Sequence, residues 1–114
     1  MAFVNHHFEP FTGGAEKTWH ITHTQGEEAR EPDTVLDLTG YSISAEVWWE
    51  GCRKLTPAIQ IGNLATGEPH YILTLSEQQT LQVPLGRVAF VKLIRVSPDG
   101  VTTIPDPVYL TRKA

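Results

Sequence analysis

Alternation of apolar and polar residues is the main pattern along this chain. No helical period extends beyond about eight residues, whereas period-two runs recur between Gly, Pro, Asn and Asp. Short strands are therefore predicted near residues 3–8, 17–24, 41–49, 58–61, 71–75, 87–96, 102–104 and 108–111. Even spacing of this kind favours an all-β antiparallel sandwich or barrel of about seven to eight short strands.

The stretch from Tyr41 to Trp49 alternates most clearly. Its odd positions are predicted to face the core and its even positions to face solvent, with Trp48 as the exception. Because Trp48 and Trp49 are adjacent, they point to opposite faces of the strand. One of them is expected in the core. The other is either covered by a second layer or exposed as an anchor for a protein or a sugar.

Residues 87–96 are apolar on both faces, with Ala89, Val91 and Leu93 opposite Val88, Phe90 and Ile94. Two explanations stay open. The segment is a central strand covered on both sides, or one face of it meets a partner. The turn residues Ser97-Pro98-Asp99-Gly100 then predict a hairpin to the next strand.

One short helical turn is predicted near residues 77–81. Ser76 stands where an N-cap is needed, and Gln79 three residues later completes a capping box. Val83-Pro84 ends the helix, because proline disfavours the helical conformation in the residue before it.

Length and composition fit one globular domain over residues 1–114. Residues 1–16 are interpreted as an N-terminal arm with the first strand, and residues 25–35 as an acidic exposed loop. The net charge of −4 argues against nucleic-acid binding, which needs a basic footprint. No apolar run approaches the length of a membrane span, and the N-terminus lacks the pattern of a signal peptide. Synthesis in the cytoplasm without secretion is expected.

Residues with catalytic potential form no familiar site. Of the five histidines, His20 and His23 are three apart in a strand and so point to opposite faces, and the pair His6-His7 does the same. Structural histidines are expected rather than a metal site. The carboxylates of the 25–35 loop are expected to be solvated, and Cys52 has no histidine near it in sequence. No nucleophile elbow or phosphate-binding glycine motif is present, so we predict no catalytic residues and no cofactor.

An ordered set of short motifs carries a resemblance. It comprises Trp19, Asp37-Leu-Thr-Gly-Tyr41, Leu73-Thr-Leu-Ser-Glu77 with Thr80, Gly86, Asp99-Gly-Val101 and Tyr109-Leu-Thr-Arg112. Over residues 11–112 the chain resembles small phage and prophage proteins found among tail and baseplate genes. It is also similar to the N-terminal domain of baseplate upper proteins. The chain departs from the family in having Phe90-Val91 where Tyr-Asp is frequent, and in a longer acidic loop before Asp37.

The resemblance implies an immunoglobulin-like sandwich and no catalysis. It implies a virion protein that acts as an adaptor in the tail, baseplate or neck, joins larger virion components and is present in multiple symmetric copies. Candidate contacts with these partners are Phe3, Phe8, Phe11, Trp48 and Tyr109. The alternatives are a capsid decoration protein, a carbohydrate- or ligand-binding module using an exposed tryptophan, and a small hydrolase or metalloprotein using the histidines.

Overall fold

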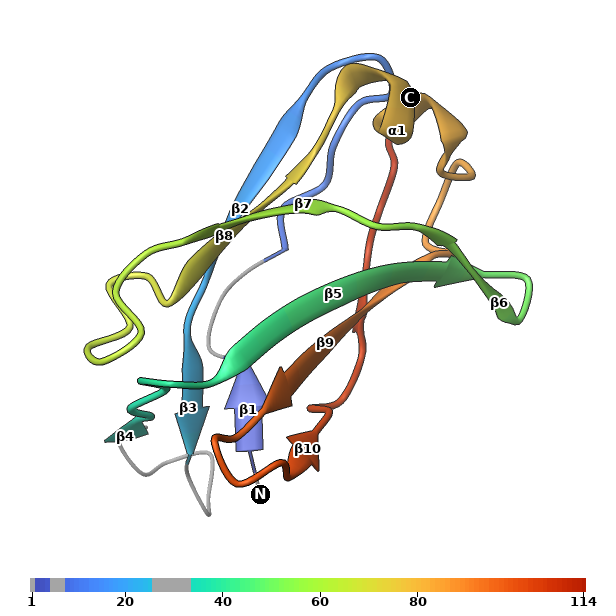
Figure 1. The fold of residues 1–114 in the computed structure, drawn as a ribbon. Coiled ribbons are helices and arrows are strands. Elements are labelled where there is room, and N and C mark those ends of the chain that lie inside the picture. The colour runs from blue at the N-terminus through green and yellow to red at the C-terminus, as the bar shows by residue number, and fades with distance from the viewer. Residues whose placement is uncertain (1, 5–7, 26–33) are drawn as a thin grey trace.

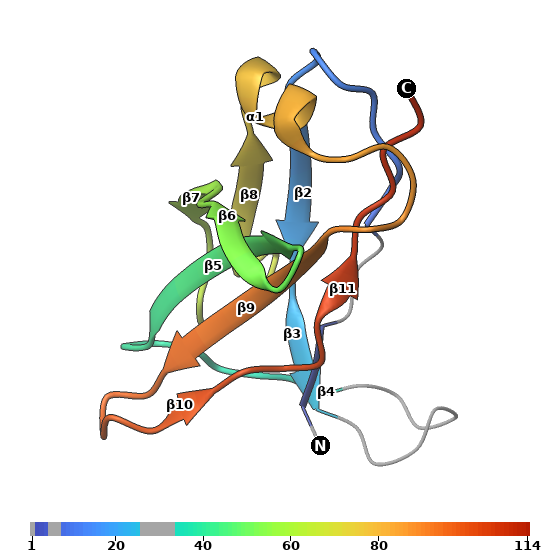
Figure 2. The ribbon, with the colours of Figure 1, turned by 90° about the vertical axis from the view of Figure 1, so that its right-hand side faces the viewer.

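The longest strands of the chain lie side by side in one antiparallel sheet. In the computed structural model, which describes residues 2–4, 8–25 and 34–114, β5 (Ser42–Trp49) pairs along its length with β9 (Phe90–Val96). The other side of β5 carries β6 (Cys52–Leu55), and the other side of β9 carries β10 (Thr102–Thr103) and β11 (Val108–Tyr109). Figures 1 and 2 show this five-stranded sheet from two directions.

A second sheet faces it across the core. This three-stranded sheet has the order β2-β8-β7, formed by Lys17–Ile21, Tyr71–Leu75 and Ala58–Ile61. A third sheet lies below it in Figure 1, with the order β1-β3-β4 and the bounds Ala2–Val4, His23–Gln25 and Thr34–Val35. All strand pairs are antiparallel. The predicted all-β sandwich is confirmed, whereas its immunoglobulin-like topology stays a prediction.

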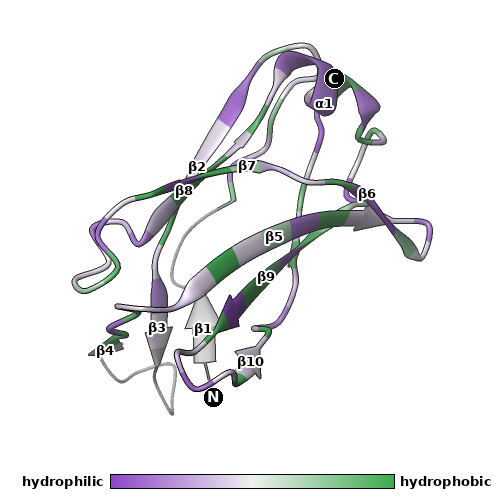
Figure 3. Ribbon diagram, in the orientation of Figure 1, coloured by the Kyte–Doolittle hydropathy of each residue, from purple (hydrophilic) through white to green (hydrophobic). Residues whose placement is uncertain are grey.

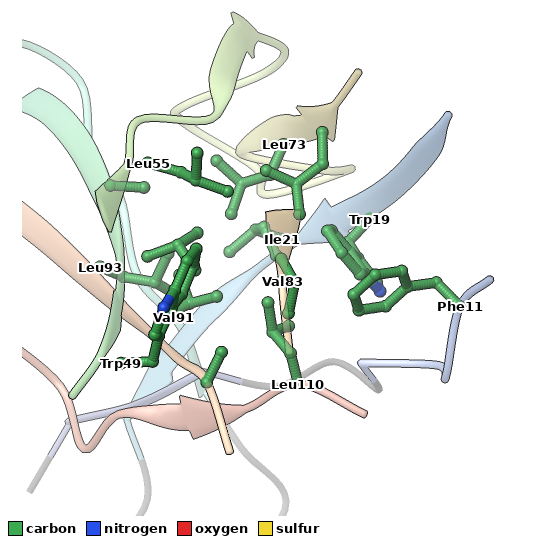
Figure 4. Packing of buried hydrophobic residues seen from close by; sticks show 14 of the residues in the cluster. Phe11, Trp19, Ile21, Trp49, Leu55, Leu73, Val83, Val91, Leu93 and Leu110 are labelled. Atoms are coloured by element: carbon green, nitrogen blue, oxygen red, sulfur yellow. The ribbon is translucent and has the colours of Figure 1, made fainter. Parts of the chain in front are cut away.

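The core forms between the two larger sheets. Ala45, Val47 and Trp49 on β5 and Val91 and Leu93 on β9 are buried against the β2-β8-β7 sheet. Figure 4 shows Trp49, Val91 and Leu93 on one side of this cluster, with Trp19, Ile21 and Leu73 across from them. The alternation predicted for residues 41–49 is confirmed, although Tyr41 and Ile43 at its start are only half-buried. The same alternation of hydrophobic and hydrophilic residues along β5 and β9 is visible in Figure 3.

The helix α1 (Glu77–Gln82) has the predicted caps. The Ser76 hydroxyl accepts from the Gln79 amide, and the Gln79 side chain accepts from the Ser76 amide. At the other end, Arg112 Nη1 donates to the carbonyls of Leu81 and Val83 at 2.9 and 2.8 Å. The C-terminal segment therefore supplies the cation that satisfies the last carbonyls of the helix.

The Asp37-Leu-Thr-Gly-Tyr41 motif forms a tight turn. Asp37 Oδ1 accepts from both the amide and the hydroxyl of Thr39, which lowers the pKa of this carboxyl. Gly40 has a φ of 82°, which side chains disfavour, and the Tyr41 amide donates to the Leu38 carbonyl. Leu38 itself is 1% exposed. In this chain the motif anchors a loop to the core.

Several predicted bounds are wrong. The segment 17–24 divides into β2 and β3 at Thr22, where the chain passes from one sheet to another, and β6 was not predicted. The predicted loop 25–35 contains the last residue of β3 and the whole of β4, and residues 26–33 lie outside the described part of the chain. The 87–96 strand begins at Phe90. Of the predicted 3–8 strand, Phe3 and Val4 belong to β1, Phe8 is outside any strand, and residues 5–7 lie outside the described part of the chain.

Candidate binding face

Four side chains form a row across the outer face of the five-stranded sheet. The strand register places Tyr109 of β11 opposite Phe90 of β9, Phe90 opposite Trp48 of β5, and Trp48 opposite Arg53 of β6. Cross-strand neighbours point to the same face of a sheet. We call Tyr109, Phe90, Trp48 and Arg53 the outer row, and we include in it the charged side chains that contact them, namely Arg87, Lys92 and Glu46. Phe90 and Trp48 each stand between two buried core residues on their strands, so the row faces away from the core.

The three aromatic rings of the outer row contact one another. Trp48 and Phe90 are stacked with centroids 6.3 Å apart, and Phe90 meets Tyr109 edge to face at 5.9 Å. Trp48 and Phe90 are half-buried, and Tyr109 is 47% exposed. The rings therefore form a continuous apolar strip across three strands that remains partly open to solvent.

Two cations lie on this strip. The ammonium of Lys92 is 3.8 Å from the centroid of the Trp48 ring, and the guanidinium carbon of Arg87 is 5.3 Å from that of Tyr109. Both distances are within the range of cation–π attraction. The ion pairs found between described residues, Lys17–Glu9 and Arg53–Glu46, include neither cation. Lys92 and Arg87 are thus held in place by aromatic rings and keep their hydrogen-bond donors available.

The carboxylate of Glu46 accepts hydrogen bonds from the indole of Trp48 and the guanidinium of Arg53. Trp48 Nε1 donates to Glu46 Oε1 at 3.0 Å, and Arg53 Nη1 donates to Glu46 Oε2 at 3.4 Å. Both oxygens of Glu46 are therefore engaged within the row. With three cations and one carboxylate, this face is locally basic in a chain whose net charge is −4.

The predicted interface residues separate into two groups. Trp48 and Tyr109 belong to the outer row, whereas Phe8 and Phe11 pack on Trp19 of β2, with ring centroids 5.3 and 5.8 Å away. Phe11 is 3% exposed and cannot present its ring to a partner in this fold, because the paired C-terminal segment helps to bury it. The side chain of Phe3 lies outside the described residues.

Sequence reasoning did not predict Arg53, Arg87, Phe90 and Lys92 as parts of one face. The available signal was the apolar outer face of residues 87–96, for which contact with a partner was one of two explanations. The other explanation required a central strand with both faces covered. The structure confirms that β9 is central, while its outer-face residues Phe90, Lys92 and Ile94 stay half-exposed.

A second polar cluster, which we call the buried junction, lies where the three sheets meet. It comprises His23 of β3, His70 and Tyr71 at the start of β8, and Arg95 of β9. His23 Nε2 lies 2.6 Å from the Tyr71 hydroxyl, and Arg95 Nη1 donates to His23 Nδ1 at 3.0 Å. His70 Nδ1 accepts from the His23 amide at 2.8 Å, and His70 Nε2 lies 2.7 Å from the Leu36 carbonyl.

These contacts define the protonation of both rings. Because Nδ1 of each histidine accepts a hydrogen bond, the proton of each neutral ring is on Nε2, which donates to Tyr71 or to Leu36. Burial lowers the pKa of His70 and of Arg95 and raises that of Tyr71. Gly67 lies so close that a Cβ there would be 2.9 Å from His70 Nε2. The junction is a packed joint between sheets, as expected for structural histidines.

The remaining candidates stay apart. His20 and Cys52 are exposed on different sheets, and His6-His7 lies outside the described residues. Within residues 2–4, 8–25 and 34–114, no three His, Cys, Asp or Glu residues gather as a metal site would require. No helix in that part of the chain is long and apolar enough to cross a membrane.

No family model, no curated protein and no solved structure matches this chain. The proposal of a function therefore rests on the fold and on the two clusters described above.

Proposed function

We propose that this protein is a non-enzymatic structural component of a bacteriophage particle. It acts as an adaptor in the tail, baseplate or neck that joins larger virion components. The outer row is the observation that supports this proposal. It is an aromatic strip, partly open to solvent and flanked by cations, on a rigid sheet. Exposed aromatic and arginine side chains of this kind are typical anchors of protein interfaces.

The motif resemblance supports the same role. The residues that carry it, such as Leu38 and the turn at Gly40, hold loops to the core and so maintain the scaffold on which the outer row is built. A small sandwich with a contact face suits a part repeated by symmetry, in which one patch serves every copy.

Quantitative peptide mass spectrometry on purified particles tests the assignment. The particles should come from the organism whose genome encodes the chain. A copy number of about six to a few dozen, as closed rings require, supports the tail, baseplate or neck. Hundreds of copies would move the protein to the capsid surface as a decoration protein. Absence from the particles would overturn the proposal.

A matched pair of variants links the assignment to the outer row. Trp48→Ala combined with Tyr109→Ala should greatly reduce incorporation of the chain into particles, whereas Lys113→Met should leave incorporation unchanged. Circular dichroism of the purified variants establishes that both are folded. Normal incorporation of the folded double variant would show that another face makes the contact.

A carbohydrate-binding module is the second candidate, favoured by the partial exposure of Trp48 and Tyr109. Lys92 covers the indole ring of Trp48 at 3.8 Å, so a sugar that stacks there must displace it. Tryptophan fluorescence titrated with neutral sugars tests this function. A saturable shift that Trp48→Ala abolishes would support it, and a flat response across several sugars would count against it.

A further inference from the structure

We infer that the outer row binds an acidic segment of a partner protein, in which two carboxylates flank an apolar side chain. This inference deepens the proposed function, because it rests on the same docking face and specifies the chemistry of the partner. Its basis is the arrangement of Lys92 and Arg87 at the two ends of the aromatic strip.

Neither cation forms an ion pair with a carboxylate of the described residues, although Glu46 is the cross-strand neighbour of Lys92. Lys92 is held against Trp48 and Arg87 against Tyr109. Glu46 is already engaged by Arg53 and by the indole of Trp48. A carboxylate from a partner can meet each cation while the cation keeps its aromatic contact, since a ring occupies only one side of it.

The spacing of the cations selects a segment over a small ligand. Tyr109 and Trp48 lie on strands on either side of β9, so the two rings that hold the cations are two interstrand spacings, or about 10 Å, apart. Phe90 lies between them and offers an apolar contact. Carboxylates seven residues apart on a helix are also separated by about 10 Å, and positions i+3 and i+4 between them face the same side. A single sugar ring is too short to reach both cations.

Charge distinguishes this partner from a nucleic acid. The net charge of the chain is −4, and a carboxylate lies within the row itself. A phosphate backbone carries a charge at every nucleotide and needs a wider basic footprint than these few cations provide, whereas a segment with two carboxylates needs only two cations. A peptide with two carboxylates and an apolar centre matches the cation–aromatic–cation order of the face.

Isothermal titration at low salt with two synthetic helical peptides tests the inference. One peptide has Glu at positions i and i+7 and Leu at i+3 and i+4, and the other has Gln in place of both Glu residues. We expect the Glu peptide to bind at least about tenfold more tightly, as the loss of two charge-assisted contacts predicts. Lys92→Met and Arg87→Met should each reduce that difference to about threefold, and Lys113→Met, at an exposed lysine outside the row, should preserve it.

Equal affinity for the two peptides would overturn the inference, as would binding that Lys92→Met and Arg87→Met leave unchanged. Tighter binding of an oligouronate or of oligodeoxythymidylate would also overturn it and would identify an anionic sugar or a nucleic acid as the ligand. The outcome of the particle experiment is independent of the outcome of the peptide titration. Peptide binding without incorporation into particles would retain the docking chemistry and reject the virion role, and the reverse result would do the opposite.

Discussion

The outer row and the buried junction are built from the same kinds of residue. They differ in whether the polar groups of those residues already have partners within the protein. Both combine aromatic rings with cations, and β9 contributes to both, with Phe90 and Lys92 on its outer face and Arg95 on its inner face. In the junction each imidazole nitrogen of His23 and His70 has a hydrogen-bond partner. In the outer row Lys92 and Arg87 lie on aromatic rings and form no ion pair with a carboxylate of the described residues.

This difference separates a structural role from a binding role. A buried polar group without a partner is strongly destabilising, so the junction persists only because its members satisfy one another. A half-exposed cation is satisfied by water and can exchange that water for a ligand. Substitutions in the junction are therefore expected to affect stability, and substitutions in the outer row are expected to affect binding.

The largest effect on stability is expected from His70→Leu. The substitution leaves the His23 amide and the Leu36 carbonyl without their partner, which should lower the free energy of unfolding by about 3 kcal/mol. Urea denaturation measures the change. His20→Leu, at an exposed position of β2, is the control and should change stability by less than about 0.5 kcal/mol. Similar losses for the two variants would remove the distinction between junction and surface.

Lowering the pH should reduce the free energy of unfolding through His70 of the buried junction. Burial, with a smaller contribution from Arg95, holds the pKa of His70 in the folded state below its ordinary value of 6.5. The unfolded chain therefore takes up a proton first as the pH falls. The contribution of neutral His70 is fully present above pH 6.5 and is lost as the pH falls from there through the folded-state pKa.

Urea midpoints measured from about pH 8 to pH 5 test this prediction. The stability difference between the wild-type chain and His70→Gln should be constant above pH 6.5 and should shrink below it. A difference that grows on acidification would mean that His70 gains stability from its charge, contrary to the neutral ring inferred from its contacts.

Tyr71→Phe should have an intermediate effect. It removes the hydroxyl that accepts from His23 Nε2 and keeps the ring, so we expect a loss of about 1–2 kcal/mol in the free energy of unfolding. Thermal unfolding followed by circular dichroism measures it. Tyr109→Phe is the matched control at the exposed end of the outer row, and its hydroxyl should contribute almost nothing to stability. An unchanged melting temperature for Tyr71→Phe would contradict the assigned hydrogen bond.

Lys92→Met should lower the free energy of unfolding by less than about 1 kcal/mol, because it removes a cation–π contact and preserves the aliphatic cover of Trp48. Its affinity for the Glu-containing peptide should fall about threefold, because one of the two charge-assisted contacts is lost. Parallel unfolding and titration experiments measure both quantities. A large loss of stability with unchanged binding would assign Lys92 a structural role and so reverse the comparison.

The smallest effect on stability is expected from Glu46→Gln. The ion pair with Arg53 spans 3.4 Å near the surface, and such pairs contribute about 0.5 kcal/mol or less. Removing the only carboxylate of the outer row should instead raise the affinity for the Glu-containing peptide about twofold to threefold. Weaker binding by this variant would indicate that the partner contributes a cation.

Most of the strands were predictable because their alternation is regular and their turns carry the expected residues. The capping box at Ser76 and Gln79 and the core face of β5 are observed as predicted. β6 was missed because it is a short edge strand with three exposed residues, and burial leaves little pattern in such a strand. The hairpin before it depends on positive φ values at Glu50 and Gly51. The Glu-Gly pair was the signal for that turn.

The sites were predictable only in part. Trp48 and Tyr109 stand out as aromatic residues at outward or terminal positions, but they are 61 residues apart in the chain. Their shared row depends on β9 lying between β5 and β11. Phe11 was expected at an interface and is in the core, because its segment pairs with the C-terminal strand end. Arg95 had a signal that went unused, since period-two spacing places it on the buried face with Val91 and Leu93.

By itself the sequence determined which residues face inward on the regularly alternating strand β5, where the helix begins and ends, and that the chain is all-β. Each of these depends on side-chain spacing and backbone preferences within a few residues. Only the tertiary structure decided which strands are neighbours. Strand order assembled Tyr109, Phe90, Trp48 and Arg53 into a row, and it enclosed His23, His70, Tyr71 and Arg95 at the junction of three sheets. The physical reason is that these groupings depend on hydrogen bonding and burial between segments far apart in the chain, which local spacing does not encode.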